Sequence, residues 1–110
     1  MAAESFGSES EPGVPIYSEF ADDAEMMELV AMFVGELPDR IAAMAAAAER
    51  DDLAGVAHFA HQIKGAAGGY GFPQITEAAT ALETCARAAD PAATRDALDA
   101  LATLCQRARG

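Results

Sequence analysis

The chain has 110 residues, of which 52% are hydrophobic and only 6% aromatic, and its formal net charge is −11. This length corresponds to one domain with a core large enough to fold alone, and the acidic charge argues against nucleic acid or an anionic membrane as a partner. Residues 1–15 lack the basic head and apolar run of a signal peptide, and no apolar stretch could span a membrane, so we expect a cytoplasmic protein.

The N-terminal residues 1–15 are rich in Ser, Gly and Pro, which predicts a flexible tail. Residues 16–110 then form the predicted domain. Ile16, Tyr17 and Phe20 make a short apolar segment at its start. We expect this segment to cap one end of the core.

The first long helix is predicted to start at Asp22 or Asp23, with Asp22 as N-cap and Glu25 completing a capping-box-like pair. Apolar residues then recur at helical spacing, at Met26, Val30, Phe33, Leu37, Ile41, Met44 and Ala48. Pro38 lies inside this pattern and removes one backbone hydrogen bond. Because the apolar phase is kept across Pro38, a kinked continuous helix is favoured over two helices.

A second helix is predicted from a cap at Asp51 or Asp52 to about Gly68 or Gly69, with Gly68, Gly69 and Gly71 ending it. At about 100° per residue, one face collects the apolar residues Val56, Phe59, Ile63, Ala66 and Ala67. The opposite face is small and polar and is centred on His61, with Ala54, His58, Gly65 and Gly68 around it and Lys64 at its edge. His61 is therefore predicted to point to solvent.

Two further helices complete the pattern. Pro73 opens the third at a favoured first-turn position, and Asp90-Pro91 opens the fourth. Their inward positions are Ile75, Ala78, Ala79, Leu82 and Ala86 in the third, and Leu98, Leu101, Leu104 and Cys105 in the fourth. Short turns between four helices predict an all-α, antiparallel up-and-down four-helix bundle, and no alternating strand pattern competes with it. Cys85 and Cys105 show no CxxC spacing and are expected to stay reduced.

Glycines inside a helix each cost about 1 kcal/mol relative to alanine, so Gly65 and Gly68 need a reason. They remove the side chains that would stand between His61 and an approaching protein surface. The antiparallel turn near Gly71 also brings the next helix level with His61. Glu83, with Thr80 and Arg87, is then a candidate to border the site, where Glu83 could hydrogen-bond Lys64 or the ring or could simply be solvated.

The run His61-Gln62-Ile63-Lys64-Gly65, followed by Gly68, Gly71 and then Leu82-Glu83, resembles the signature of histidine-containing phosphotransfer (Hpt) domains. Five spaced positions agree, and the resemblance covers about residues 17 to 108. The stretch from Gly65 to Phe72 is closest to the version at the front of chemotaxis-type kinases. The resemblance implies a carrier that accepts a phosphoryl group on His61 from a receiver aspartate and passes it to another receiver.

The resemblance also implies the partners and the contact residues. The partners would be the receiver domain of a response regulator, a hybrid histidine kinase, or both. Lys64, Gln62, Gly65, Gly68 and Glu83 would contact the phosphoryl group or the partner. The chain would have no cofactor of its own, and the receiver would bring Mg²⁺ together with its aspartate. A neutral imidazole is a suitable nucleophile, since its unperturbed pKa is about 6.5.

Alternative functions remain. The chain could dock on receiver domains without carrying phosphate. A metal site at His58 and His61 would need further ligands on the same face, which the sequence does not provide. An autonomous histidine kinase is excluded because the bundle uses the whole length and leaves no room for an ATP-binding domain. A monomer is expected, since one apolar face per helix can be buried within a single bundle.

Overall fold

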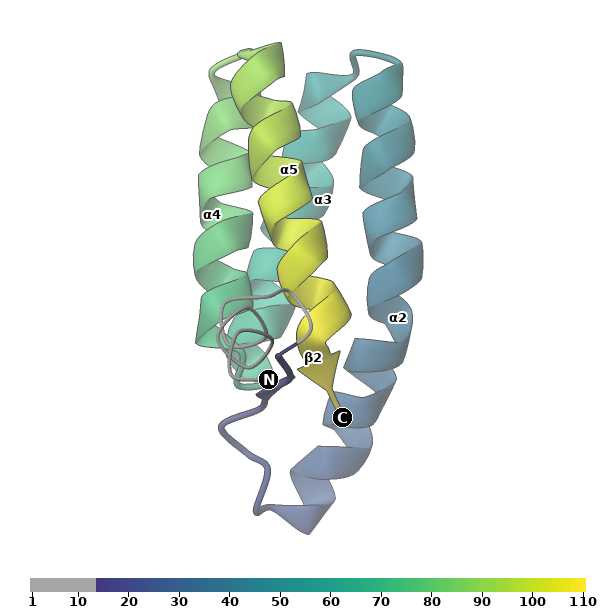
Figure 1. Ribbon diagram of the computed structural model, residues 1–110, viewed down its shortest axis with the longest axis vertical. Helices are drawn as coiled ribbons and strands as arrows, with labels where there is room; N and C mark the ends of the chain where they lie inside the picture. The colour runs from purple at the N-terminus through teal and green to yellow at the C-terminus, as the bar shows by residue number, and fades with distance from the viewer. Residues whose placement is uncertain (1–13) are drawn as a thin grey trace, which may run out of the picture.

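The computed structural model describes residues 14–110, and within this range four helices form one bundle: α2 (Ala24–Glu49), α3 (Leu53–Gly69), α4 (Pro73–Arg87) and α5 (Pro91–Arg107). Successive helices run in opposite directions and lie side by side (Figure 1). This confirms the predicted all-α up-and-down bundle. No helix in residues 14–110 has the length and apolarity needed to cross a membrane. Most of the predicted tail, residues 1–13, lies outside the described residues.

The N-cap of α2 lies one residue later than predicted. Asp23, not Asp22, is the N-cap, and its Oδ1 accepts hydrogen bonds from the backbone N–H groups of Glu25 at 3.0 Å and Met26 at 3.2 Å. The predicted Asp22–Glu25 pairing is therefore wrong. Asp22 belongs to the preceding turn, which closes with the Asp23 N–H donating to the Phe20 carbonyl at 2.9 Å.

The helix then continues through Pro38 to Glu49, which confirms the prediction of one helix over two. Pro38 is exposed, so its ring lies outside the buried core. The N-terminal turns of α2 extend beyond the ends of the other three helices (Figure 1). Most of the predicted apolar stripe is buried, while Met26 and Ile41 at its margins are half-buried.

The core runs along the bundle axis and is built from aliphatic side chains with two phenylalanines. The largest fully buried side chains are Phe33, Phe72, Leu37, Met44, Ile63, Ile75, Leu82, Leu101, Val30, Val56 and Thr94. On α3, Val56, Ile63 and Ala67 are buried, whereas Phe59 and Ala66 are only partly covered. The apolar face of α3 thus packs inward, so the His61 face is left for solvent.

The predicted capping segment forms a strand pair. Ile16–Tyr17 (β1) runs parallel to Ala108–Arg109 (β2), with Ile16 opposite Ala108. Ile16 is buried against the core as expected, but Tyr17 is 64% exposed. The sequence did not predict this pairing, because two residues are too short to show an alternating pattern. A side-chain hydrogen bond also joins the two segments: Arg107 Nε donates to the Val14 carbonyl at 2.7 Å.

The turn between α3 and α4 is fixed by the segment that follows β1. The Ser18 hydroxyl donates to the Tyr70 carbonyl at 2.6 Å, and the Glu19 N–H donates to the Gly71 carbonyl at 2.8 Å. Gly71 has φ +84°, and a Cβ there would lie 2.6 Å from Ser18 Oγ. Only glycine fits this position. Of the glycines predicted to end α3, Gly71 is therefore the one with the left-handed backbone.

Both cysteines are free, as expected. Cys85 is half-buried in α4, and Cys105 is buried in α5. Burial raises the pKa of the Cys105 thiol to about 12. Cys105 therefore stays a protonated, apolar packing group at neutral pH.

Candidate functional site

His61 lies in the middle of α3 on the face that turns away from the core, and 61% of its side chain is exposed. Its neighbours on that face, Ala54, His58, Gly65 and Gly68, are also exposed. The predicted small, polar face of α3 is thereby confirmed. The imidazole stands on it with small residues one and two turns away.

Glu83 of α4 lies beside the ring and is the centre of a charged cluster. Its side chain is only 10% exposed, and its Oε2 lies 3.2 Å from His61 Nδ1. Lys64 Nζ donates to Oε1 at 2.7 Å. The structure therefore brings together three residues that the sequence predicted for the site, and Glu83 contacts both the ring and the lysine.

Arg87, one turn after Glu83 on α4, completes the cluster. Its Nε donates to Glu83 Oε2 at 2.9 Å, and its Nη2 lies 2.8 Å from the same oxygen. The sequence signal for this contact is the i,i+4 spacing of Glu83 and Arg87. Thr80, the other residue predicted to border the site, instead donates to the Thr76 carbonyl at 2.8 Å within α4.

The cluster determines which ring nitrogen of His61 can react. Hydrogen bonds from Lys64 and then Arg87 lower the pKa of Glu83 from 4.5 to about 2. At neutral pH the carboxylate can only accept hydrogen bonds, so the proton on the ring must lie on Nδ1. The lone pair is then on Nε2. This nitrogen is the one available to an electrophile from outside.

The lowered pKa of Glu83 gives a pH prediction. Since the folded-state pKa of about 2 lies below the ordinary 4.5, the ionised cluster stabilises the fold above about pH 4.5. That contribution is lost as the pH falls towards 2. In Lys64→Ala the Glu83 pKa should move up towards 4.5, because the largest cause of the shift is removed. Carboxyl ¹³C NMR titration measures both values.

A matched control for this titration is Arg40→Ala. Arg40 pairs with Glu36 within α2 at 3.1 Å and does not touch Glu83. Its removal should leave the Glu83 pKa at about 2. An unchanged Glu83 pKa in Lys64→Ala would contradict the assignment of Lys64 as its main partner.

Gln62 does not join the cluster. Its side-chain amide donates to His58 Nε2 at 3.2 Å, and both side chains are exposed. Gln62 and His58 therefore form a separate polar pair beside the ring. Contact of Gln62 with the phosphoryl group or the partner stays a prediction.

Gly65 and Gly68 are not required by packing within the chain. A Cβ at Gly65 would meet no atom within 4 Å, and one at Gly68 would meet only Thr76 Oγ1, at 3.7 Å. Both positions could hold alanine, which is the better helix former. The space beside His61 is thus left open towards the outside.

Two hollows flank His61 along the seam between α3 and α4. Ala54 and Gly68 each lie seven residues from His61 on the same stripe, which is about 10 Å along the helix. The hollow at the Ala54 end has a volume of about 380 Å³ and is lined by Leu53, Ala54, Ala57, Ala86, Arg87 and Ala89. The hollow at the Gly68 end has a volume of about 310 Å³ and is lined by Glu19, Gly68, Gly71, Pro73, Thr76 and Glu77. The ring therefore stands between two recesses.

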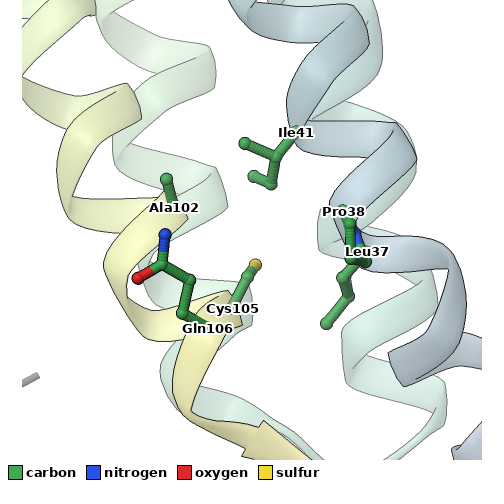
Figure 2. A pocket seen from close by; sticks show the side chains of 6 residues that line it. All are labelled: Leu37, Pro38, Ile41, Ala102, Cys105 and Gln106. Carbon is green, nitrogen blue, oxygen red and sulfur yellow. The ribbon is translucent and has the colours of Figure 1, made fainter. Parts of the chain in front are cut away.

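A third hollow lies away from this face. It has a volume of about 240 Å³, lies between α2 and α5, and is lined by Leu37, Pro38, Ile41, Ala102, Cys105 and Gln106 (Figure 2). Its walls are mainly apolar, with Gln106 the one side-chain amide among them. Because Cys105 is protonated, no charged side chain lines this hollow.

The described residues contain no group of three or more His, Cys, Asp or Glu side chains arranged to hold a metal ion. Within residues 14–110, Glu83 is the one carboxylate that contacts His61, and its oxygens accept hydrogen bonds from Lys64 and Arg87. Among the described residues, the fold brings no further ligand to a metal site at His58 and His61.

Comparison with known families gave one match. The sequence model of the Hpt domain matches residues 28–110, which is most of the chain and includes all of the residues in the cluster. Neither the curated proteins nor the solved structures that were compared with the chain gave a match.

Proposed function

Because the chain belongs to the Hpt domain family, whose members are phosphotransfer carriers of two-component signalling and not kinases, we propose that His61 carries the phosphoryl group. It would accept the group from the phospho-aspartate of a receiver domain, or through a histidine kinase relay, and pass it to another receiver aspartate. The observation that supports this most is the geometry of the ring. His61 is 61% exposed, and its Nδ1 is held by a buried carboxylate.

The reaction at His61 follows from that hydrogen bond. The Nε2 lone pair attacks phosphorus, the N–P bond forms, and the P–O bond to the aspartate breaks with its electron pair left on the aspartate carboxylate. The Nδ1 proton stays on the ring, where Glu83 at 3.2 Å offsets the positive charge that develops there. The reverse sequence returns the phosphoryl group to a second receiver.

Lys64 supplies the local positive charge. Phosphoryl transfer depends mainly on positioning and on neutralising charge, and the Lys64 ammonium belongs to the same cluster as the ring. Its side chain is 31% exposed, so it is partly accessible from the face that receives the partner. We infer that Lys64 contacts the phosphoryl group during transfer.

The face around His61 would receive the partner. Gly65 and Gly68 keep the surface low beside the ring, and the two hollows that flank it offer recesses for side chains of the partner. A receiver domain must bring its aspartate within bonding distance of Nε2, so a low surface is required there. Gln62 and His58 lie at the rim of this docking surface.

The Mg²⁺ of the reaction is assigned to the partner in this proposal. The carboxylate of Glu83 is already neutralised by Lys64 and Arg87, so it is a poor ligand for a divalent cation. The receiver would bring the metal ion together with its aspartate. On the carrier side, only the ring and the ammonium group would meet the phosphoryl group.

The test is to incubate the chain with phosphorylated receiver domains and to measure its intact mass. Gain of one phosphoryl group that is labile in acid and stable in alkali, mapped to His61 by fragmentation, would support the proposal. Lack of any gain with several competent receivers, together with measurable binding to them, would instead identify a docking module that carries no phosphate.

A further inference from the structure

Arg87 holds the same oxygen of Glu83 as the histidine ring. Its Nε and Nη2 lie 2.9 and 2.8 Å from Glu83 Oε2, while His61 Nδ1 lies 3.2 Å from that atom. The other oxygen, Oε1, is taken by Lys64 at 2.7 Å. The Glu83 side chain is 10% exposed, whereas that of Arg87 is 62% exposed. One nearly buried carboxylate is therefore shared by two cations and a ring N–H.

This sharing matters once a phosphoryl group reaches His61. The group places negative charge at Nε2, and Lys64 can neutralise it fully only by leaving Glu83. Removing a cation from a nearly buried carboxylate is unfavourable when nothing else compensates its charge. Arg87 stays on Oε2 through two nitrogens, so Glu83 remains paired when the lysine moves. Lys64 can thus neutralise the phosphoryl group while Arg87 neutralises Glu83.

We propose that Arg87 is a positioning residue for phosphoryl transfer: it keeps Glu83 paired so that Lys64 can turn from Glu83 to the phosphoryl group on His61. Arg87 itself does not touch the reacting atoms in this arrangement. The inference rests on the proposed function of His61. It adds a second residue of α4, after Glu83, to those that support the reaction at His61.

The first experiment is a double-mutant cycle on the rate of transfer from a phosphorylated receiver. Lys64→Ala should slow transfer by roughly tenfold in the wild-type background, the size of one charge-assisted hydrogen bond. In an Arg87→Gln background the same change should have little effect, because Lys64 is already held by Glu83. Arg87→Lys, which restores the charge with one donor group, should recover part of the loss.

Arg95→Gln is the matched control. Arg95 lies on α5, is 53% exposed and pairs with Asp51 at 3.4 Å, so its removal changes the charge equally without touching Glu83. In the Arg95→Gln background, Lys64→Ala should still slow phosphoryl transfer roughly tenfold. The comparison separates a specific effect on Lys64 from a general loss of positive charge.

A second measurement needs no phosphoryl donor. With Arg87 removed, Lys64 is the one cation left on Glu83, so its ammonium protons should exchange with water more slowly in Arg87→Gln than in wild type. NMR of the lysine side chains measures this exchange. Equal exchange in the two proteins would overturn the inference.

The transfer outcomes also separate the two proposals. Suppose that wild type accepts a phosphoryl group, but Lys64→Ala slows transfer by the same factor with and without Arg87. The proposed role of Arg87 is then overturned, and His61 remains the carrier. If wild type accepts none from receivers that phosphorylate other Hpt domains, the proposed function fails and the role of Arg87 fails with it.

Discussion

His61→Gln is expected to abolish phosphoryl acceptance and to leave the fold intact. The glutamine amide nitrogen has no free lone pair, so it cannot form the N–P bond. The ring is 61% exposed, and within residues 14–110 its side-chain hydrogen-bond partner is Glu83, so the free energy of unfolding should change by no more than about 0.5 kcal/mol. Intact mass after incubation with a phosphorylated receiver measures acceptance, and thermal unfolding followed by circular dichroism measures stability.

His58→Gln is the matched control for this variant. His58 is exposed on the same face of α3, one turn earlier, and its partner is Gln62 and not the carboxylate. The control should accept a phosphoryl group as well as wild type does. Acceptance by His61→Gln, or its loss in His58→Gln alone, would contradict the assignment of the phosphoacceptor.

Gly65→Leu should block transfer from the receiver while leaving the chemistry of the ring available. A leucine side chain one turn from His61 would occupy the low surface that the partner needs, and a displacement of about 1 Å can cost roughly 100-fold in rate. A small donor such as phosphoramidate needs no docking surface, so it should still phosphorylate the variant at nearly the wild-type rate. The ratio of the two rates isolates docking from reactivity.

Gly35→Leu gives the control for backbone effects. Gly35 lies inside α2, and a Cβ there meets no atom within 4 Å, as at Gly65. Both substitutions replace a helical glycine by a better helix former, so each should raise the free energy of unfolding by about 0.5–1 kcal/mol. Only Gly65→Leu should lose transfer from the receiver. Normal transfer by Gly65→Leu would show that the surface beside His61 does not contact the partner.

The helices could be predicted from the sequence because each carries its signal locally. Asp52 caps α3 and Asp90 caps α5, and Pro73 and Pro91 occupy the first helical positions. The apolar periodicity also survives Pro38, which indicated one helix where a proline alone would have suggested two. The exposure of His61 followed from the same periodicity, since the opposite face of α3 had to be buried.

The contacts that the sequence left open are those between segments far apart in the chain. Glu83 on a helix face is ordinarily a solvated side chain, and only the packing of α4 against α3 places it beside His61 and Lys64. The β1–β2 pair joins residues at opposite ends of the sequence through two residues each, too few for a pattern. The start of α2 was misplaced by one residue because Asp22 and Asp23 are chemically equivalent caps, and the preceding turn selects between them.

The family match begins at residue 28, but the hydrogen bonds that finish the bundle begin earlier. A chain that began at residue 28 would lack two of these hydrogen bonds. One is from the Ser18 hydroxyl to the Tyr70 carbonyl, and the other is from Arg107 Nε to the Val14 carbonyl. Its last turn of α3 would open more often, and amide hydrogen exchange would accelerate first around Gly68 to Phe72 and then towards His61. Residues 14–20 therefore support the end of the helix that carries the histidine, although they lie before the start of the family match.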